Sequence, residues 1–271
     1  MHSASQRLPV LFIGHGSPMN AIEDTPFRRA WQKLGSEFGV RWHKPTLILC
    51  ISAHWITPGW WLTGMARPKT IHDFGGFPQA LFDQQYPAPG APDWVAQTAV
   101  RLKQPHTGEP VGIDLQAWGL DHGAWSVLKP MFPAADIPVV QLSIGYHRPP
   151  SEHFALGQQL RALRDEGVLI VASGNTVHNL RTMDRSAADN EAFDWAIAFD
   201  QWVAQRISAF DNAALADFQS QGADAQMSHP SYEHYLPLLY AAGAAVPGEP
   251  VAFFNEGYQL SSIAMRSVIW G

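Results

Sequence analysis

Three histidines in this sequence stand in equivalent places, each a few residues after a short apolar run. His15 follows residues 9–13, His54 follows residues 46–51, and His178 follows residues 168–172. Such runs, rich in β-branched side chains, are typical of strands that are buried on both faces of a sheet. In an open α/β sheet ligands bind at the carboxyl ends of the strands, so we expect these imidazoles to meet at one sheet edge. A single histidine of this kind is more often structural, but three in equivalent places indicate a functional site.

Two further histidines are candidates from outside the predicted strands. His122 is flanked by Asp121 and Gly123, and His234 lies beside Glu233. Three neutral imidazoles suit Zn²⁺ or Fe²⁺, and additional histidines can then orient a substrate or move protons. The sequence therefore predicts a site for one divalent metal, Fe(II) or Zn(II).

A metal held by three protein ligands with open positions supports two chemistries. Zn²⁺ would lower the pKa of a bound water and make a hydrolase, whereas Fe²⁺ would bind both an oxygenated substrate and O₂. The sequence contains no HExxH helix, no GxSxG elbow, and no GxGxxG or Walker lysine beside residues 14–17. A nucleotide site is thus disfavoured. The open alternatives are a ferrous oxygenase, a zinc-dependent hydrolase and a non-catalytic, metal-stabilised binding protein.

Composition excludes several classes of partner. The 271 residues carry a formal net charge of −6 and form no Lys/Arg cluster, which argues against nucleic acid. No stretch reaches the roughly 18 apolar residues of a membrane span, and the N-terminus shows no export segment. We expect a cytoplasmic protein, a monomer or small homo-oligomer, that acts on a small molecule. Cys50, the only cysteine, is expected to be a buried and inert thiol.

Strands and helices alternate along the chain, which predicts a single α/β domain spanning residues 1–271 around a mainly parallel, mixed central sheet flanked by helices. Further strands are expected at 60–62, 111–115 and 139–144, and a C-terminal β-hairpin at 251–258 and 262–269. Helices are expected at 26–38, 92–103, 151–167 and 190–208. A last helix capped by Ser231 would place His234 in its first turn and would be strained by Pro237.

The segment 71–90 is a long connection rich in Gly, Pro and aromatic residues. Long connections in compact domains are usually functional or disordered, and the aromatic content argues against disorder. We expect residues 71–86 of this segment to wall the site, with His72 and Asp73 available for polar contacts; the alternative is a surface lid that packs on the core.

Six blocks of sequence carry a resemblance to a known family. They are GHGSPMN at 14–20, SAHW at 52–55, IHDFGGFPQALF at 71–82, AWGLDHGAW at 117–125, ASGNTVHNLR at 172–181 and EHYLPLLY at 233–240. In this order they resemble the bacterial 4,5-DOPA extradiol dioxygenases, within the class III, LigB-like extradiol enzymes. The resemblance implies insertion of both atoms of O₂ next to the two hydroxyls of a catechol. The implied substrate is L-DOPA, cleaved to a muconic semialdehyde that cyclises to a betalamic-acid-like product.

The resemblance also implies roles for individual residues. His15, His54 and His234 match metal ligands, and His178 matches a residue that is either a further ligand or the proton-transfer group. His178 or His122 would then deprotonate the catechol. The wider superfamily uses two histidines and a glutamate, so Glu233 and His229 stand as alternatives to His234, and the native metal, Fe(II) or Zn(II), stays open.

Overall fold

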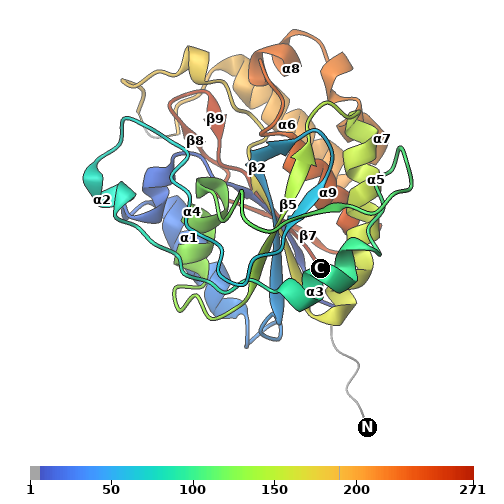
Figure 1. Ribbon diagram of the computed structural model, residues 1–271. Helices are drawn as coiled ribbons and strands as arrows, with labels where there is room; N and C mark the ends of the chain where they lie inside the picture. Colours follow the sequence, from blue (N-terminus) through green and yellow to red (C-terminus); the bar gives the residue numbers. More distant parts are fainter. Residues whose placement is uncertain (1–6, 189) are drawn as a thin grey trace.

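The computed structural model describes residues 7–188 and 190–271, and it is built around one eight-stranded mixed sheet in the order β4-β3-β5-β2-β6-β1-β10-β7 (Figure 1). The four central strands run parallel to one another: β5 (Val139–Gly145), β2 (Leu47–Thr57), β6 (Val168–Gly174) and β1 (Val10–Gly14). One flank adds β3 (Trp61–Thr63), antiparallel to β5, and β4 (Gly112–Asp114). The predicted α/β class with a mainly parallel, mixed sheet is confirmed.

The other flank is formed by the C-terminal residues. Strand β7 (Val251–Phe254) pairs antiparallel with β10 (Ser267–Trp270), and β10 pairs antiparallel with β1. The predicted hairpin is thus present, but its two long arms are divided. Their inner parts form a separate two-stranded ribbon of β8 (Tyr258–Gln259) and β9 (Ile263–Ala264).

Helices cover both faces of the sheet (Figure 1). The described helices on the face of Leu11 and Val171 are α1 (Pro26–Glu37) and α4 (His122–Met131). The opposite face, which carries Phe12 and Ile170, is covered by α3 (Pro92–Ala99), α5 (Pro150–Leu160), α6 (Asp194–Ser208) and α9 (Leu236–Ala244). Because β1, β5 and β6 are buried along their whole length, only the strand ends are accessible to a ligand.

Short elements connect these layers. They are η1 (Pro18–Ala21), α2 (Gln79–Phe82), η2 (Arg161–Glu166), η3 (Leu180–Thr182), α7 (Asn212–Ala216), η4 (Phe218–Ser220) and α8 (Ala223–Ser228). In the described parts of the chain, no helix has both the length and the apolar character that a bilayer crossing requires. The export-segment prediction falls largely on residues 1–6, which lie outside the described residues.

Three local predictions were wrong. Strand β2 does not end at residue 51 but continues to Thr57, so His54 lies within the strand, where the register with β5 shifts between Ile51 and Ile56. Helix α4 was not predicted, because His122 and Gly123 at its start and Pro130 near its end are weak helix formers. Its usable signal was Asp121, whose side chain accepts a hydrogen bond from the Ala124 amide.

The third error concerns the segment from Ser231. Helix α9 begins at Leu236, so His234 precedes the helix, and Pro237 sits in the first turn. Proline is tolerated there because the first turn has no intrahelical partner for its amide. The expected strain is therefore absent.

Elsewhere the predicted helices are shorter than expected, with α3 ending at Ala99 and α6 beginning at Asp194. Cys50 is buried, as predicted.

The close packing of α5 on α9 generates a stability prediction. A Cβ at Gly157 would come 2.5 Å from the carbonyl oxygen and 2.8 Å from the Cα of Tyr240, which are both backbone atoms. We expect Gly157→Ala to lower the free energy of unfolding by about 1–3 kcal/mol, because the helices must move apart. Gly75 is the matched control, since a Cβ added there would have no atom within 4 Å. Urea unfolding that shows Gly75→Ala to be as destabilised as Gly157→Ala would contradict the packing argument.

Candidate metal centre

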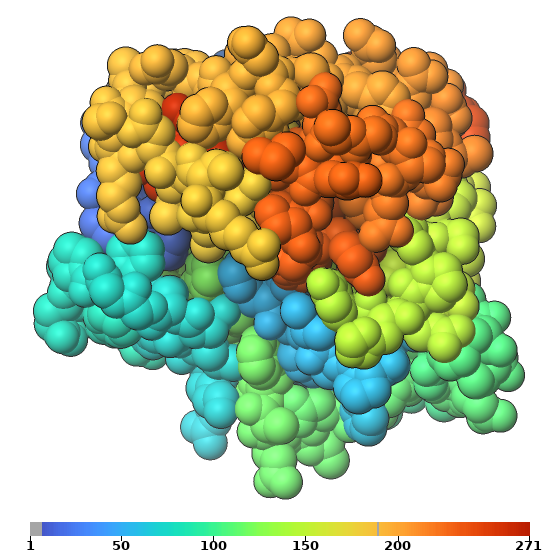
Figure 2. All heavy atoms as spheres, turned by 90° about the horizontal axis from the view of Figure 1, so that it is seen from above, coloured from blue at the N-terminus to red at the C-terminus, as the bar shows by residue number. Residues whose placement is uncertain are grey.

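Five histidines from five different segments lie together at the carboxyl ends of the central strands. They are His15 after β1, His54 in β2, His122 at the start of α4, His178 after β6 and His234 before α9. The predicted convergence at one sheet edge is observed. On the face seen from above, the blue end of β2 is bordered by the teal segment 71–90 and by gold and orange segments from the second half of the chain (Figure 2).

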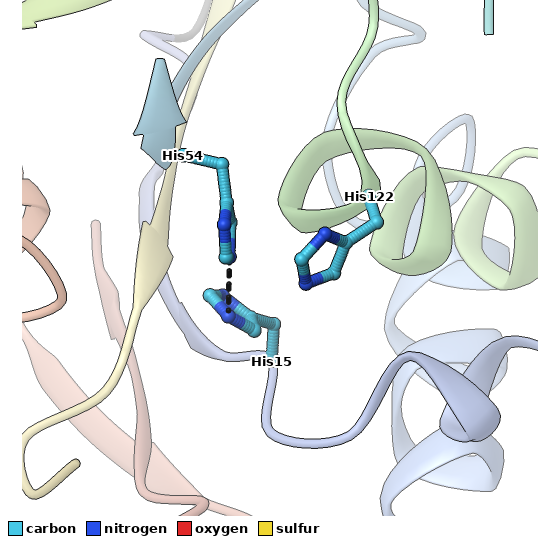
Figure 3. A group of neighbouring side chains, drawn as sticks. All are labelled: His15, His54 and His122. Carbon is cyan, nitrogen blue, oxygen red and sulfur yellow. Dashed lines mark hydrogen bonds between the residues drawn. The ribbon is translucent and has the colours of Figure 1, made fainter. Parts of the chain in front are cut away.

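Three of the imidazoles form a nearly regular triangle. Ring centroids are 5.1 Å apart for His15 and His54, 5.2 Å for His15 and His234, and 5.0 Å for His54 and His234. The Nε2 atoms of His15 and His54 face each other at 3.3 Å (Figure 3). Two nitrogens bound at about 2.0–2.1 Å to one tetrahedral metal are separated by about 3.3 Å, so this spacing fits a shared metal ion.

The outer nitrogens of these rings have partners in the protein. Nδ1 of His54 lies 3.3 Å from Oδ2 of Asp73, and Nδ1 of His234 lies 3.1 Å from Oε1 of Glu233. An ionised carboxylate only accepts hydrogen bonds, so in the neutral imidazoles the proton is on Nδ1. The Nε2 lone pairs are then free on the inner side, as metal ligation requires.

Burial sets the charge state of the site. Burial first, and neighbouring histidines second, lower the pKa of His15, His54 and His234 well below the usual imidazole range. Burial likewise lowers the pKa of His178 to about 3. At neutral pH these rings are uncharged, and the neutral imidazole is the form that binds a metal ion.

Asp73, from segment 71–90, joins two of the histidines. Its Oδ1 lies 3.0 Å from Nδ1 of His122 and accepts a hydrogen bond from the His122 amide at 2.9 Å, while Oδ2 faces His54. Burial raises the pKa of Asp73, but the contacts with His122 and His54 outweigh it and lower the pKa to about 2. His72, the other polar residue expected at the site, instead contacts the backbone carbonyl of Gln84.

His178 differs from the other four histidines. Its ring stacks on the His234 ring with centroids 3.5 Å apart and planes 6° from parallel. Among the described residues, no hydrogen bond to its ring nitrogens is formed. The segment that carries it is held by the hydrogen bond from its amide to the Ser228 carbonyl.

The two alternatives to His234 are placed differently. His229 is buried among the rings of Phe199, Phe218 and Tyr235, and its Nε2 contacts the Thr176 carbonyl at 2.8 Å. Glu233 lies close enough to His178 and His234 for a shared ion, but its Oε1 also contacts the outer nitrogen of His234.

Four polar residues beneath the histidines were not predicted to support the site: Ser52, Asp121, Gln141 and Ser173. Asp121 accepts hydrogen bonds from Ser52 Oγ at 2.6 Å and from Gln141 Nε2 at 2.7 Å, and it caps α4. Ser173 contacts Nδ1 of His15 at 3.0 Å. The available signal was their polarity at the ends of otherwise apolar strands, which is unusual for a buried edge.

Comparison with known proteins places this site in context. The family described as the catalytic LigB subunit of aromatic ring-opening dioxygenase matches residues 9–266. A 4,5-DOPA dioxygenase extradiol of Escherichia coli K12 is 47% identical over 268 residues, covering 98% of this chain and 95% of that protein. One from Beta vulgaris is 38% identical, covering 86% of this chain and 85% of that protein.

A solved structure agrees with these sequence matches. A crystal structure described as an uncharacterized protein from Escherichia coli K12 superimposes with a TM-score of 0.82 at 41% sequence identity. The match covers 98% of this chain and 100% of that chain. The whole fold, including the sheet edge that carries the histidines, is therefore shared with a protein solved by crystallography.

The depressed imidazole pKa values predict how stability depends on pH in the metal-free protein. The unfolded chain takes up protons on its histidines below about pH 6.5, whereas the folded chain does not, so stability falls as pH decreases. For His178, whose folded pKa is about 3, the loss between pH 6.5 and pH 5 is about 1.5–2 kcal/mol. We expect His178→Gln to lose less stability over this interval than the unsubstituted protein in urea unfolding. Equal losses would show that His178 is not buried in its neutral form.

Proposed function

Because the chain belongs to the LigB family of aromatic ring-opening dioxygenases, we propose that it opens the ring of a catechol with O₂ beside the two hydroxyls. L-DOPA, cleaved at its 4,5 bond, is the proposed substrate, since the relatives that match most of the chain are named for that reaction. Residues 1–271 would act as one catalytic domain. A cytoplasmic location and a monomeric or small homo-oligomeric state stay predictions from the sequence.

The observation that carries this proposal is the convergence of three neutral imidazoles, those of His15, His54 and His234, whose ring centroids lie 5.0–5.2 Å apart. We place one divalent metal on His15, His54 and His234, because their ring centroids form a nearly regular triangle and their Nδ1 atoms have oxygen partners. His122 is the alternative third ligand, since ligand atoms of His15, His54 and His122 lie within 4.8 Å of one another. Fe(II) bound there would supply adjacent positions for the catechol oxygens and O₂, which brings the two reactants together. A ligand set of imidazoles alone also accepts Zn(II), so the metal identity is part of the test.

We assign acid–base chemistry to His178. Imidazole lone pairs lie in the ring plane, and the His178 plane is parallel to that of His234 and stacked 3.5 Å from it. The lone pairs of the two stacked rings therefore lie in separate parallel planes, so we place His178 outside the set of metal ligands. The ring nitrogens of His178 form no hydrogen bond among the described residues, so one of them would accept a proton from a catechol hydroxyl and return it to the opened product.

His122 is the second residue proposed to act on the substrate. Asp73 holds its Nδ1, which directs the opposite edge of the ring toward His54 and His15 (Figure 3). This edge would orient a catechol oxygen by a hydrogen bond.

Phe74 packs edge-on against His122, with ring centroids 5.4 Å apart, and it contacts Phe77 and Trp125. The aromatic part of segment 71–90 would thereby wall the ring of the substrate and exclude water.

The reaction is tested by anaerobic reconstitution of the metal-free protein with Fe²⁺, followed by addition of catechols and O₂. We expect oxygen uptake and a yellow ring-opened product, with L-DOPA among the substrates. The same protein loaded with Zn²⁺ is the control, and we expect no oxygen uptake from it. Absence of oxygen uptake across several catechols, with ester hydrolysis by the zinc form, would favour the hydrolase instead.

The residue roles are tested by metal content and rate measured together. His15→Ala, His54→Ala and His234→Ala are expected to lose bound metal, because each removes one of three ligands. His178→Gln and His122→Ala are expected to keep the metal and to lose rate, by about 10²–10⁴-fold for the proton-transfer residue. His147, which is exposed, provides the control His147→Ala. Equal metal content in all the variants would contradict the assignment.

A further inference from the structure

Two serines on neighbouring strands lie directly beneath the histidines. Ser52 of β2 and Ser173 of β6 are register partners in the sheet, and Ser173 is also the partner of Ile13 in β1. Both serines are fully buried. Because buried hydroxyls need partners, their hydrogen bonds determine what they do.

The hydrogen of the Ser173 hydroxyl lies in its short contact with Gly123. Its Oγ lies 2.6 Å from the backbone carbonyl of Gly123, and a carbonyl oxygen carries no proton. The hydroxyl therefore donates its single hydrogen to Gly123. Its contact of 3.0 Å with Nδ1 of His15 must then run in the other direction, with the imidazole N–H donating to the serine oxygen.

This direction fixes the tautomer of His15. A neutral imidazole with its proton on Nδ1 has a bare Nε2, and this Nε2 is the atom that faces Nε2 of His54 at 3.3 Å. Asp73 favours the same tautomer in His54. Two lone pairs thus face each other, an arrangement that a cation between them stabilises and that repels without one.

Without the serine oxygen, the opposite arrangement becomes available. His15 could carry its proton on Nε2 and donate it to Nε2 of His54, so that the two imidazoles would pair with each other. A metal ion would then have to break this hydrogen bond and displace the proton before binding.

We infer that Ser173 is a positioning residue that holds His15 in the Nδ1–H tautomer and so prevents the two inner imidazoles from pairing. The tautomer of His15 is a property of the metal-free protein and does not depend on the proposed function. Its effect on metal binding rests on the proposed function. Through Gly123, the same hydroxyl also ties His15 to the first turn of α4, which carries His122.

Ser52 offers a matched control in the same plane of the sheet. Its hydroxyl donates to Oδ1 of Asp121 at 2.6 Å and so supports the cap of α4. It forms no described hydrogen bond with an imidazole nitrogen, and it accepts a hydrogen bond of 3.3 Å from the backbone amide of His54. Removing this hydroxyl perturbs the start of α4 but leaves the proton of His15 where it is.

The inference is tested first by the ¹⁵N resonances of the imidazoles in the metal-free protein, which distinguish protonated from bare ring nitrogens. We expect His15 in the Nδ1–H form in the unsubstituted protein and in Ser52→Ala, and in the Nε2–H form or a mixture in Ser173→Ala. Ser173→Thr keeps the hydroxyl and should restore the Nδ1–H form. An Nε2–H form in the unsubstituted protein overturns the inference without any variant, whether or not the protein is a dioxygenase.

A second measurement determines the affinity of each variant for a metal ion. In competition with a coloured chelator, Ser173→Ala is expected to bind Zn²⁺ about 10–100-fold more weakly than the unsubstituted protein. Ser52→Ala should lose less affinity than Ser173→Ala. Equal losses in the two variants would show that Ser173 acts only by supporting α4. If the tautomer shifts as expected but no catechol consumes oxygen, the inference stands and the proposed function fails.

Discussion

Both ring nitrogens of a buried imidazole need a hydrogen-bond partner or a metal ion. In the three central histidines of this site, only Nδ1 has an oxygen partner among the described residues. Ser173, Asp73 and Glu233 face the Nδ1 atoms of His15, His54 and His234. The Nε2 atoms of His15 and His54 face each other at 3.3 Å, and burial keeps all three rings neutral. Such a set of lone pairs costs stability unless a cation occupies it. The rest of the fold has to hold it open.

Sheet topology provides that rigidity. Parallel strands β1, β6 and β2 lie side by side, so their ends bring His15, His178 and His54 to one edge without a long loop. His122 is the first residue of α4, and His234 lies just before α9. The first turn of α4 is held to the sheet by Ser52 and Ser173, and a side chain at Gly123 would meet Ser52 and come 2.8 Å from Cδ2 of His54. Glycine is therefore needed where α4 approaches the strand.

Much of this arrangement could be predicted from the sequence, because apolar runs identify buried strands. The positions of His15 and His178 at the carboxyl ends of two strands follow from where those runs stop. The position of His54 was less predictable. Strand β2 continues past its polar residues because Ser52 and Ile56 pair with neighbouring strands, and pairing partners are not visible in a single sequence. The start of α9 was misplaced for a related reason, since Pro237 is compatible with a first turn as well as with a kink.

The hydrogen bonds of the supporting residues could not be predicted from the sequence. Asp73 lies in a segment expected to contact the site, but nothing in its neighbours indicates that it joins His54 to His122. Ser173 acts through a hydrogen bond to Gly123, which is 50 residues away in the chain. Contacts of this kind depend on how α4 docks, and α4 itself was not predicted.

The central claim is that one metal ion binds between the inner nitrogens of three histidines, and an anomalous-scattering crystal structure of the metal-loaded protein tests it most directly. We predict a single ion bound by Nε2 of His15, His54 and His234 at about 2.0–2.2 Å, with His178 stacked beside it and not coordinated. An ion bound through an Nδ1 atom, or held by His178 and Glu233 instead, would contradict this claim.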